Sequence, residues 1–379
     1  MKDVLGVLKR WLSKDVEPNV LALEHSDTYP SEIVEQMASF GLFGATIPAE
    51  YGGLGLTATA YSRVVTLIAE TWMSLTGVLN SHLMMAHLVE RFGTQTQRVE
   101  FLPRLASGTL RGGLALTEPD CGTDLQAIRT VAMRTPDGAY RITGRKMWIT
   151  NARYGNCLAL LVKTNPTAQP RHAGMSMFLV EKEIDGYLAG PKLGKLGYRG
   201  VDTVEVEFND VEVPSSRLLG EREGHGFHHA LGGLELGRIN VAARGCGVAN
   251  AALKAALQYS KVRHTMGRPI GDHQAIALKL ADMGCRARAA ELLTREAAGA
   301  FDAGRRCDLE AGMAKLAATE AALSNATEAM RVHGAYGYST EAHVERYFRD
   351  APLLCIGEGT NEIQRVVIAK RLLAEVGQR

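Results

Sequence analysis

The hydrophobic pattern of this chain changes twice along its length, and this change restricts the fold more than any other feature. Up to about residue 110, apolar side chains recur at helical spacing, as at Ile33, Met37 and Phe40 before Gly41. Short β-like runs separated by turn residues follow, and from about residue 223 long helical runs return. A chain of 379 residues is also too long for one core. We therefore predict an α+β multidomain protein with an N-terminal α-helical domain (1–110), a middle small β-barrel or β-sandwich domain (111–222) and a C-terminal four-helix bundle (223–379).

The same patterns predict the individual elements. The helical run at 226–263 carries many glycines and alanines on one face, which allows neighbouring helices to approach closely. Short connections between the long C-terminal helices indicate an up-down bundle. The predicted helices are 59–69, 75–92, 95–105, 226–263, 273–300, 308–332, 342–348 and 360–374, and the predicted strands are 131–135, 140–143, 147–150, 158–163, 175–180, 204–208 and 211–213.

Composition and charge argue against several classes of function. A net charge of +2 gives no electrostatic reason to expect nucleic acid as the main partner. No apolar run approaches the roughly 20 residues of a membrane span. The N-terminus lacks the pattern of a secretory signal, and acids from Asp3 onward argue against a transit peptide. The six cysteines are scattered without a C-x-x-C pair, so we predict reduced thiols and a cytoplasmic protein.

Several familiar catalytic motifs are missing from the sequence. There is no G-x-G-x-x-G after a strand, no P-loop and no G-x-S-x-G elbow. Three histidines, His225, His228 and His229, lie close together, but no carboxylate accompanies them at ligand spacing. We therefore predict no metal site.

One acid near the C-terminus stands between two glycines. Glu358 lies between Gly357 and Gly359, directly before Thr360 and a helical run. Acids and hydroxyls at a helix N-terminus commonly only stabilise the helix, by about 0.5 to 1 kcal/mol. Glycines on both sides also let a backbone come close to a ligand, which would suit a catalytic carboxylate. Local pattern leaves both interpretations open.

Two further stretches have the polarity of a binding site. The first, 114–124, is a Gly- and Pro-containing loop that leaves an apolar strand. The second, 144–151, places Trp148 and Thr150 two residues apart, so both side chains project from the same face of a strand. A flat heterocyclic cofactor could stack on this indole and bond to this hydroxyl, although a strand tryptophan is also a common core residue.

Taken together, these stretches identify a family. In order they read Ile47-Pro48-x-Glu50-Tyr51-Gly52-Gly53, Thr117-Glu118-Pro119-x-x-Gly122-Thr123-Asp124, Lys146-Met147-Trp148-Ile149-Thr150-Asn151, Arg263-x-x-x-Gly267-Arg268-Pro269-Ile270 with His273-Gln274-Ala275, and Glu358-Gly359-Thr360-x-Glu362-Ile363-Gln364-Arg365. This series resembles the acyl-CoA dehydrogenase family of flavoproteins over essentially the whole chain.

The resemblance implies a cofactor, partners and a set of site residues. FAD would lie between the β domain and the bundle and would be completed by a neighbouring subunit of a homotetramer, a dimer of dimers. The substrate would be an acyl-CoA, and an electron-transferring flavoprotein would accept the electrons. The implied cofactor-binding residues are Leu114, Leu116, Thr117, Trp148, Ile149, Thr150, Thr360 and Glu362, with Arg263, Met266, Gln274, Arg331 and Gly334 contributed by the neighbouring subunit. The implied substrate-binding residues are Thr123, Glu235, Arg238, Gly357 and Gly359.

The resemblance also implies the base and the reaction. Glu358 matches the family's base on the C-terminal loop, and Gly237 occupies the alternative position of that base on the first bundle helix. Glu358 would remove the α-proton of the thioester while the β-hydrogen leaves as hydride to N5 of FAD, giving the trans-2-enoyl-CoA.

Departures from the family pattern bear on the substrate. Arg331 and Ala335 differ from the usual residues of the FAD-binding turn, and Gly357 replaces a tyrosine. The missing aromatic side chain opens space near the α-carbon, so we predict a short, medium or branched acyl group. No lysine or arginine lies between Arg63 and Arg91, which argues against glutaryl-type enzymes. The alternatives are a carrier-protein-bound acyl group, oxygen as acceptor, and a low-turnover family member that acts as a binding or assembly partner.

Overall fold

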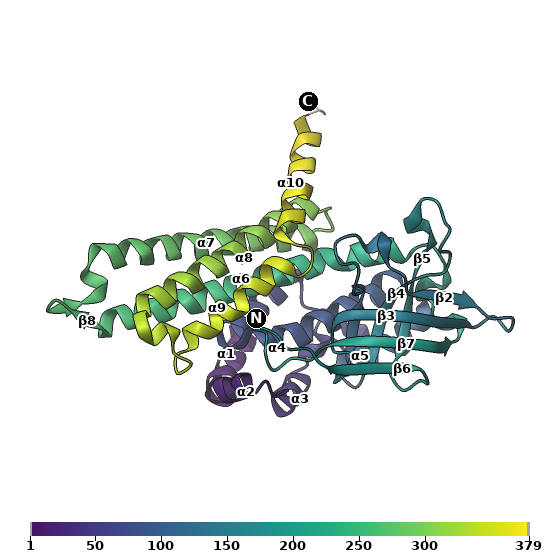
Figure 1. Ribbon diagram of the computed structural model, residues 1–379, viewed down its shortest axis with the longest axis horizontal. Coiled ribbons are helices and arrows are strands. Elements are labelled where there is room, and N and C mark those ends of the chain that lie inside the picture. Colours follow the sequence, from purple (N-terminus) through teal and green to yellow (C-terminus); the bar gives the residue numbers. More distant parts are fainter. Residues whose placement is uncertain (1, 377–379) are drawn as a thin grey trace.

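The computed structural model describes residues 2–376, and its N-terminal third is helical, as predicted (Figure 1). A single long helix, α4 (Ala58–Phe92), organises this region and bends at Trp72, where φ is −151° and ψ is 103°. The sequence predicted two helices here, and the bend accounts for the gap between them. The other helices of this region are α1 (Lys2–Trp11), α2 (Val20–His25), α3 (Ser31–Ser39) and α5 (Gln95–Ser107).

The middle region forms one curled sheet of seven strands within residues 2–376 (Figure 1). The strand order is β1-β4-β2-β3-β7-β6, with β5 paired to β4. Most pairings are antiparallel, while β1 and β2 run parallel to β4. The bounds are β1 (Gly112–Ala115), β2 (Val131–Arg134), β3 (Tyr140–Thr150), β4 (Cys157–Lys163), β5 (Met175–Glu181), β6 (Tyr187–Lys192) and β7 (Thr203–Val213).

The predicted breaks within two strands were wrong, and a third strand was missed. Gly144 and Asp210 have positive φ, and their turn-like sequences predict strand ends. In the structure β3 and β7 continue past both residues, because the two strands pair with each other across a register shift near Gly144. The strand β6 was not predicted at all, since its burial pattern is irregular.

The C-terminal region is a helix bundle made of α6 (Gly226–Val262), α7 (Gln274–Asp302), α8 (Asp308–His333) and α9 (His343–Ile356). The small residues of α6 allow the predicted close approach: a Cβ added at Gly245 would lie 2.7 Å from the backbone of Ala318 in α8. The helix α9 runs eight residues further than predicted, through Pro352. A two-stranded hairpin, β8 (His264–Thr265) with β9 (Arg268–Pro269), closes the far end of the bundle (Figure 1).

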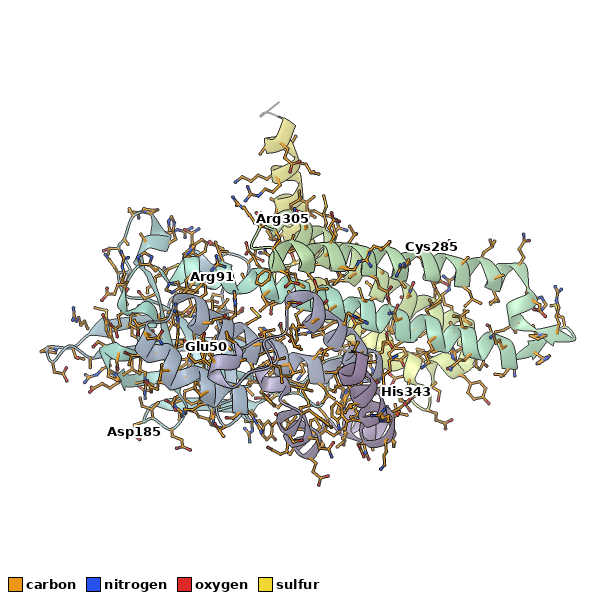
Figure 2. All side chains as sticks on the ribbon, turned by 180° about the vertical axis from the view of Figure 1, so that it is seen from behind. Glu50, Arg91, Asp185, Cys285, Arg305 and His343 are labelled. Atoms are coloured by element: carbon orange, nitrogen blue, oxygen red, sulfur yellow. The ribbon has the colours of Figure 1, made fainter. Side chains whose placement is uncertain are left out.

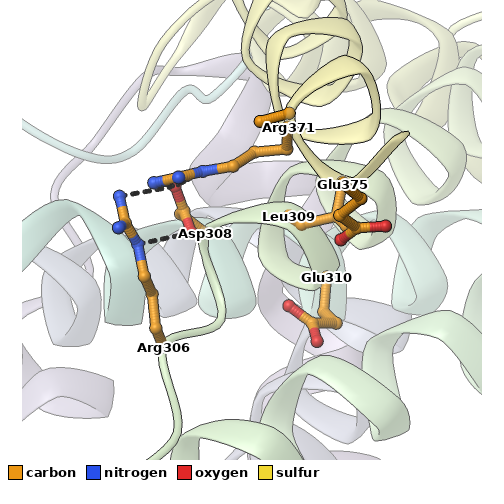
Figure 3. Close-up of a pocket in the computed structure, with 7 residues that line it drawn as sticks. Arg306, Asp308, Leu309, Glu310, Arg371 and Glu375 are labelled. Carbon is orange, nitrogen blue, oxygen red and sulfur yellow. Dashed lines mark hydrogen bonds and ion pairs between the residues drawn. The ribbon is translucent and has the colours of Figure 1, made fainter. Parts of the chain in front are cut away.

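The last helix, α10 (Asn361–Val376), leaves the bundle and projects from the body of the molecule (Figure 1). Its side chain Arg371 donates to Asp308 at the start of α8, at 2.6 Å, and Arg306 binds the same carboxylate at 3.1 Å (Figure 3). These residues line a surface hollow of about 230 Å³ at the junction. Exposed apolar side chains, Val366 and Leu373, continue along the projecting helix.

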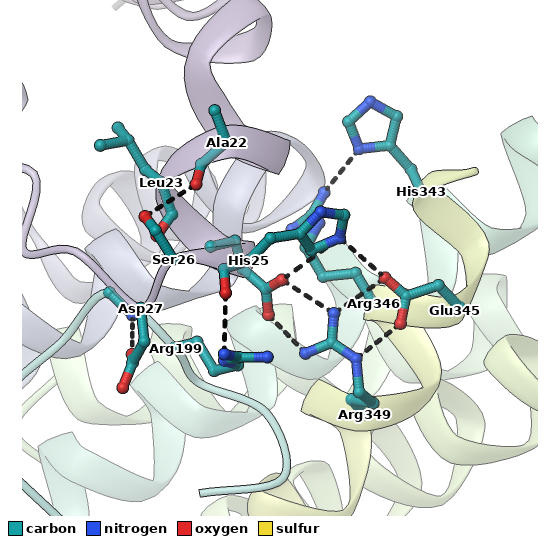
Figure 4. Close-up of polar contacts among 12 residues, drawn as sticks. Ala22, Leu23, His25, Ser26, Asp27, Arg199, His343, Glu345, Arg346 and Arg349 are labelled. Carbon is teal, nitrogen blue, oxygen red and sulfur yellow. Dashed lines mark hydrogen bonds and ion pairs between the residues drawn. The ribbon is translucent and has the colours of Figure 1, made fainter. Parts of the chain in front are cut away.

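A buried ionic network joins the N-terminal helices to the bundle (Figure 4). Arg349 of α9 binds Glu24 of α2 at 2.5 and 2.8 Å and Glu345 at 2.5 and 2.8 Å. Glu24, His25 and Glu345 are close enough together to suit a metal ion. The guanidinium of Arg349 already lies against both carboxylates, so this cluster is a set of ion pairs. None of the helices within residues 2–376 is both long and apolar enough to cross a membrane.

Candidate active site

Glu358 lies on the loop between α9 and α10, and its side chain points into the protein. Its backbone has φ +57°, a left-handed conformation that is uncommon for a non-glycine residue. The side-chain amide of Asn80 in α4 donates to Oε1 of Glu358 at 3.1 Å. The hydroxyl of Thr360, in contrast, accepts the N–H of Ile363 at 3.3 Å. Thr360 therefore caps α10, and the carboxylate of Glu358 takes no part in this cap.

The carboxylate of Glu358 rests on α6 at a position that only glycine can occupy without displacement. A Cβ added at Gly237 would lie 3.0 Å from Oε2 of Glu358 and 2.9 Å from Sδ of Met84. The absence of a side chain at this point thus makes room for the acid. Gly237, Met84 and Asn80 enclose the carboxylate from α6 and α4.

The surroundings of Glu358 are electrostatically mixed. Burial raises the pKa of Glu358, while the charges of Arg244 and Arg238, the hydrogen bond from Asn80 and the charge of Lys315 lower it, with burial prevailing. No cation within residues 2–376 approaches Glu358 within the 4.0 Å of an ion pair. The acid is therefore held near several cations without being neutralised by one of them, which suits a group that exchanges a proton.

A buried lysine holds both ends of the loop that carries Glu358. Lys315 of α8 is 0% exposed and donates to the carbonyl of Cys355 at 3.1 Å and to Oδ1 of Asn361 at 2.7 Å. Burial lowers the pKa of Lys315 to about 8. Sequence reasoning missed this residue, and its signal is a single lysine on an alanine face of α8, between Ala311, Ala314 and Ala318.

The predicted aromatic platform lies at the end of β3. Trp148 has φ +63° and sits in a register shift between Lys146 and Ile149. Its indole is 54% exposed, Ile149 is buried and Thr150 is half-buried, so Trp148 and Thr150 face away from the sheet core together. A classical strand core role for Trp148 is therefore ruled out by its exposure.

Tyr198 connects this platform with the acid. Burial raises the pKa of Tyr198, while the charge of Arg244 and the side chain of Thr150 lower it and the charge of Glu358 raises it. Its phenol occupies the space that Gly77 leaves open on α4, because a Cβ added at Gly77 would lie 1.4 Å from the hydroxyl. Sequence reasoning did not single out Tyr198.

The loop after β1 is fixed beside the platform by a buried ion pair. Lys146, 0% exposed, donates to the carbonyl of Leu116 at 3.0 Å and to Oε1 of Glu118 at 2.8 Å. Burial lowers the pKa of Lys146 to about 8. Burial raises the pKa of Glu118, but Lys146 and backbone hydrogen bonds lower it by more. The net result is a pKa below the usual value of a glutamate. The N–H of Met147 also donates to the carbonyl of Thr117 at 2.9 Å.

The predicted residues thus fall into separate groups. Leu114, Leu116 and Thr117 lie beside Trp148, Ile149 and Thr150, and Gly357 and Gly359 flank Glu358. Arg238 is half-buried on α6 near Glu235, Thr123 is exposed on the loop after β1, and Glu362 is exposed in the first turn of α10.

A last group lies at the far end of the bundle. Arg263, Met266 and Gln274 are at the β8–β9 hairpin and the start of α7, and Arg331 and Gly334 are at the end of α8. Along α6, the rise from Gly237 to Arg263 is roughly 40 Å at 1.5 Å per residue. Asp185 of the sheet region and Cys285 of α7 likewise lie toward opposite ends of the molecule (Figure 2). One chain therefore does not bring this group to the platform.

The platform residues suit a flat cofactor such as a flavin. The indole of Trp148 is more than half exposed, and within residues 2–376 no aromatic ring stacks on it. The backbone of the neighbouring loop is held in place by Lys146 and Met147. A rigid backbone edge beside an open aromatic face provides both the hydrogen bonds and the contact area that a heterocycle needs.

Comparison with known proteins gives a consistent assignment. Models of the acyl-CoA dehydrogenase N-terminal, middle and C-terminal domains match residues 2–109, 113–211 and 224–373. An acyl-CoA dehydrogenase of Bacillus subtilis (strain 168) is 39% identical, over 97% of this chain and 96% of its own length. An acryloyl-CoA reductase (NADH) of Anaerotignum propionicum is 35% identical, over 98% of this chain and 94% of its own length. The structure of butyryl-CoA dehydrogenase from Megasphaera elsdenii superimposes with a TM-score of 0.95 at 35% identity, covering 98% of this chain and 97% of the other.

These matches cover nearly all of the chain and follow the helical, β and helical regions in the same order. The chain therefore belongs to the acyl-CoA dehydrogenase family of FAD-dependent oxidoreductases.

Proposed function

We propose that this protein dehydrogenates the α,β bond of an acyl-CoA thioester, with Glu358 as the base. The observation that carries the proposal is the carboxylate of Glu358, which is turned inward onto Gly237, held by Asn80 and kept apart from every ion-pair partner within residues 2–376. A catalytic base must be free to accept a proton, and it accepts one more readily when its pKa is raised toward the working pH.

In our proposal, each FAD is bound by residues from two subunits. Leu114, Leu116, Thr117, Trp148, Ile149, Thr150, Thr360 and Glu362 would hold the cofactor in one subunit, and Arg263, Met266, Gln274, Arg331 and Gly334 would hold its other end in the neighbour. The separation of roughly 40 Å along α6 supports this division. Exposed apolar side chains on α7 and α10, Leu278 at 60% and Leu373 at 74%, support a homotetramer in which these helices are covered.

The chemical step uses groups that the chain itself provides. Bound FAD supplies the hydride acceptor. Asn80 orients the carboxylate of Glu358, which takes the α-proton of the substrate. The N–H of Glu358 would bond the thioester carbonyl, where negative charge develops as the proton leaves. Substrate binding would remove water from the acid and raise its pKa further.

The substrate we propose is a short, medium or branched acyl-CoA, and the acceptor an electron-transferring flavoprotein. Gly357 supports this range, because among residues 2–376 only the carbonyl of Leu353 lies within 4 Å of a Cβ added there. The likeness to a butyryl-CoA dehydrogenase supports a short chain. The likeness to an acryloyl-CoA reductase favours a second candidate, the same site used to reduce an enoyl-CoA. Consumption of NADH with an enoyl-CoA, in the absence of any other electron donor, would distinguish this second function.

The test is an anaerobic titration of the purified holoenzyme with acyl-CoAs, followed by the bleaching of the flavin absorbance. We expect Glu358→Gln to bind FAD normally and to bleach roughly 10³-fold more slowly. The control is Glu341→Gln, which removes an exposed carboxylate before α9 and should bleach at the wild-type rate. Fast bleaching by Glu358→Gln would show that another group is the base.

A further inference from the structure

Arg244 is a buried cation that the reaction described above does not need. It is 5% exposed and lies on α6, seven residues after Gly237, so the two positions share one face of the helix. Its Nε donates to Oδ1 of Asn240 at 2.7 Å, and the amide of Asn240 donates to the hydroxyl of Tyr61 at 2.9 Å. These bonds fix the stem of the guanidinium and fold it back toward Gly237.

The outer end of Arg244 has no partner. Within residues 2–376, neither of its terminal nitrogens takes part in a hydrogen bond, and no carboxylate comes within 4.0 Å. A buried charge without a partner is destabilising, so proteins rarely keep one without a use. A guanidinium with its forked end free is suited to bind a carboxylate through two parallel hydrogen bonds.

The guanidinium of Arg244 lies near both Glu358 and Tyr198. Among the charges near Glu358, that of Arg244 has the largest effect on its pKa, and the same holds for Tyr198. The helix α4 packs against α6 at two places near Arg244. Met84 of α4 lies against Gly237, and the hydroxyl of Thr66 donates to the carbonyl of Ala243 at 3.2 Å. The bend of α4 at Trp72 lies between these two contacts along the helix.

We propose that Arg244 binds a second carboxylate at the end of the acyl group, so that the preferred substrates are short dicarboxylyl thioesters. This inference rests on the proposed function. The bond to Asn240 puts the guanidinium one helical turn, on the order of 5 Å, beyond the level of Glu358. That distance suits acyl groups of about four to six carbons, counting about 1.2 Å per bond. The sequence argued against such substrates because residues 64–90 hold no lysine or arginine; the cation comes from α6 instead.

The test compares thioesters of equal length with and without the second carboxylate. For the holoenzyme, kcat/KM is measured with glutaryl- and adipyl-CoA and with pentanoyl- and hexanoyl-CoA. We expect wild type to prefer the dicarboxylyl member of each pair at least tenfold. Arg244→Gln should lower kcat/KM for the dicarboxylyl thioesters about 10- to 100-fold, the effect of losing hydrogen bonds to a charged group, and leave the linear thioesters within about threefold. Arg244→Lys should recover part of the loss, because it keeps the charge without the fork.

The control for the loss of an arginine is Arg288→Gln on the outer face of α7, which should change neither class of substrate. A wild-type preference for the linear thioesters overturns the inference even if Arg244→Gln does not fold. Equal slowing of both classes by Arg244→Gln also overturns it, since Arg244 would then act only through Glu358. If linear thioesters bleach the flavin and dicarboxylyl ones do not, the inference fails and the proposed function stands. If no thioester bleaches it, both fail.

Discussion

Two buried lysines hold the two sides of the site, and they do so differently. Lys146 fixes the loop beside the aromatic platform and has the carboxylate of Glu118 at 2.8 Å. Lys315 fixes the loop that carries Glu358, but its acceptors are a carbonyl and an amide oxygen, both neutral. Both side chains are 0% exposed, and burial lowers the pKa of each to about 8.

Because their acceptors differ, Lys146 should hold the sheet side of the site rigidly, and Lys315 should hold the loop of Glu358 less rigidly. A buried ion pair with further hydrogen bonds to the carboxylate is strongly destabilised when one partner is removed, by about 3 to 5 kcal/mol. Hydrogen bonds from a charged donor to neutral acceptors contribute less, about 1.5 to 3 kcal/mol. The sheet side therefore provides a fixed surface, and the loop with Glu358 can adjust more readily to what binds there.

Removing the carboxylate on the sheet side should have the largest effect. Glu118→Ala leaves Lys146 buried without an anion, so we expect a loss of about 3 to 5 kcal/mol in the free energy of unfolding. Urea unfolding of the holoenzyme, read by circular dichroism, measures this loss. The double variant Glu118→Leu with Lys146→Met should recover most of it, and a stable Glu118→Ala would show that this pair is not the anchor of the loop.

Removing the lysine on the bundle side should have a smaller effect on stability and a clear one on turnover. Lys315→Met removes two buried hydrogen bonds to the loop, so we expect about 1.5 to 3 kcal/mol of destabilisation and roughly tenfold lower kcat. Lys279→Met, a change on α7, is the matched control. A kcat equal to that of wild type would mean that the loop does not depend on Lys315.

Adding one methyl group beneath the acid should have a moderate effect on the side of Glu358 alone. Gly237→Ala puts a Cβ 3.0 Å from Oε2 of Glu358, so the carboxylate must shift by a few tenths of an ångström. We expect kcat/KM to fall about tenfold, or about 1.4 kcal/mol. In Gly233→Ala, on the same helix, the new Cβ meets Leu88 at 3.1 Å and leaves the acid alone. Equal effects of both variants would attribute the loss to the helix contact.

The smallest expected effect is a change of stability with pH. The pKa of Lys315 is about 8 in the folded chain and near 10.5 in a free lysine, so between these values the unfolded chain binds more protons. Stability due to Lys315 therefore rises with pH, by on the order of 1 kcal/mol between pH 7 and pH 9. Urea unfolding of wild type and Lys315→Met at both pH values measures the difference. A difference that does not change with pH would show that the ammonium is not desolvated.

The sequence predicted the domain architecture and the small face of α6 because both depend on local periodicity. It missed the unbroken β3 and β7, since Gly144 and Asp210 look like turns until the partner strand is known. It also stopped α9 too early at residue 348, although the helix continues through Pro352. Local sequence pattern predicts the secondary structure of a segment when neighbouring residues determine it. The prediction fails when contacts with a distant segment determine the structure.

The same limit applies to the site. Glu358 could be singled out from its glycines and from family motifs, but the inward turn of its side chain depends on a left-handed backbone and on Asn80, which is 278 residues away. Arg244, Lys315 and Tyr198 carry no motif of their own. Their importance comes only from what the fold places beside them.

The fit of Tyr198 onto Gly77 has a consequence for how this protein can change over time. A methyl group at position 77 would collide with the phenol oxygen at 1.4 Å and with the ring carbon Cζ at 2.2 Å, so removing the hydroxyl alone would not make room. Any larger residue at position 77 must wait for a much smaller one at position 198, and that first step opens a hole beside the acid and the platform. We therefore expect positions 77 and 198, which lie on different domains, to change together. A chimaera that takes one of these domains from a relative will need that relative's residues at both positions.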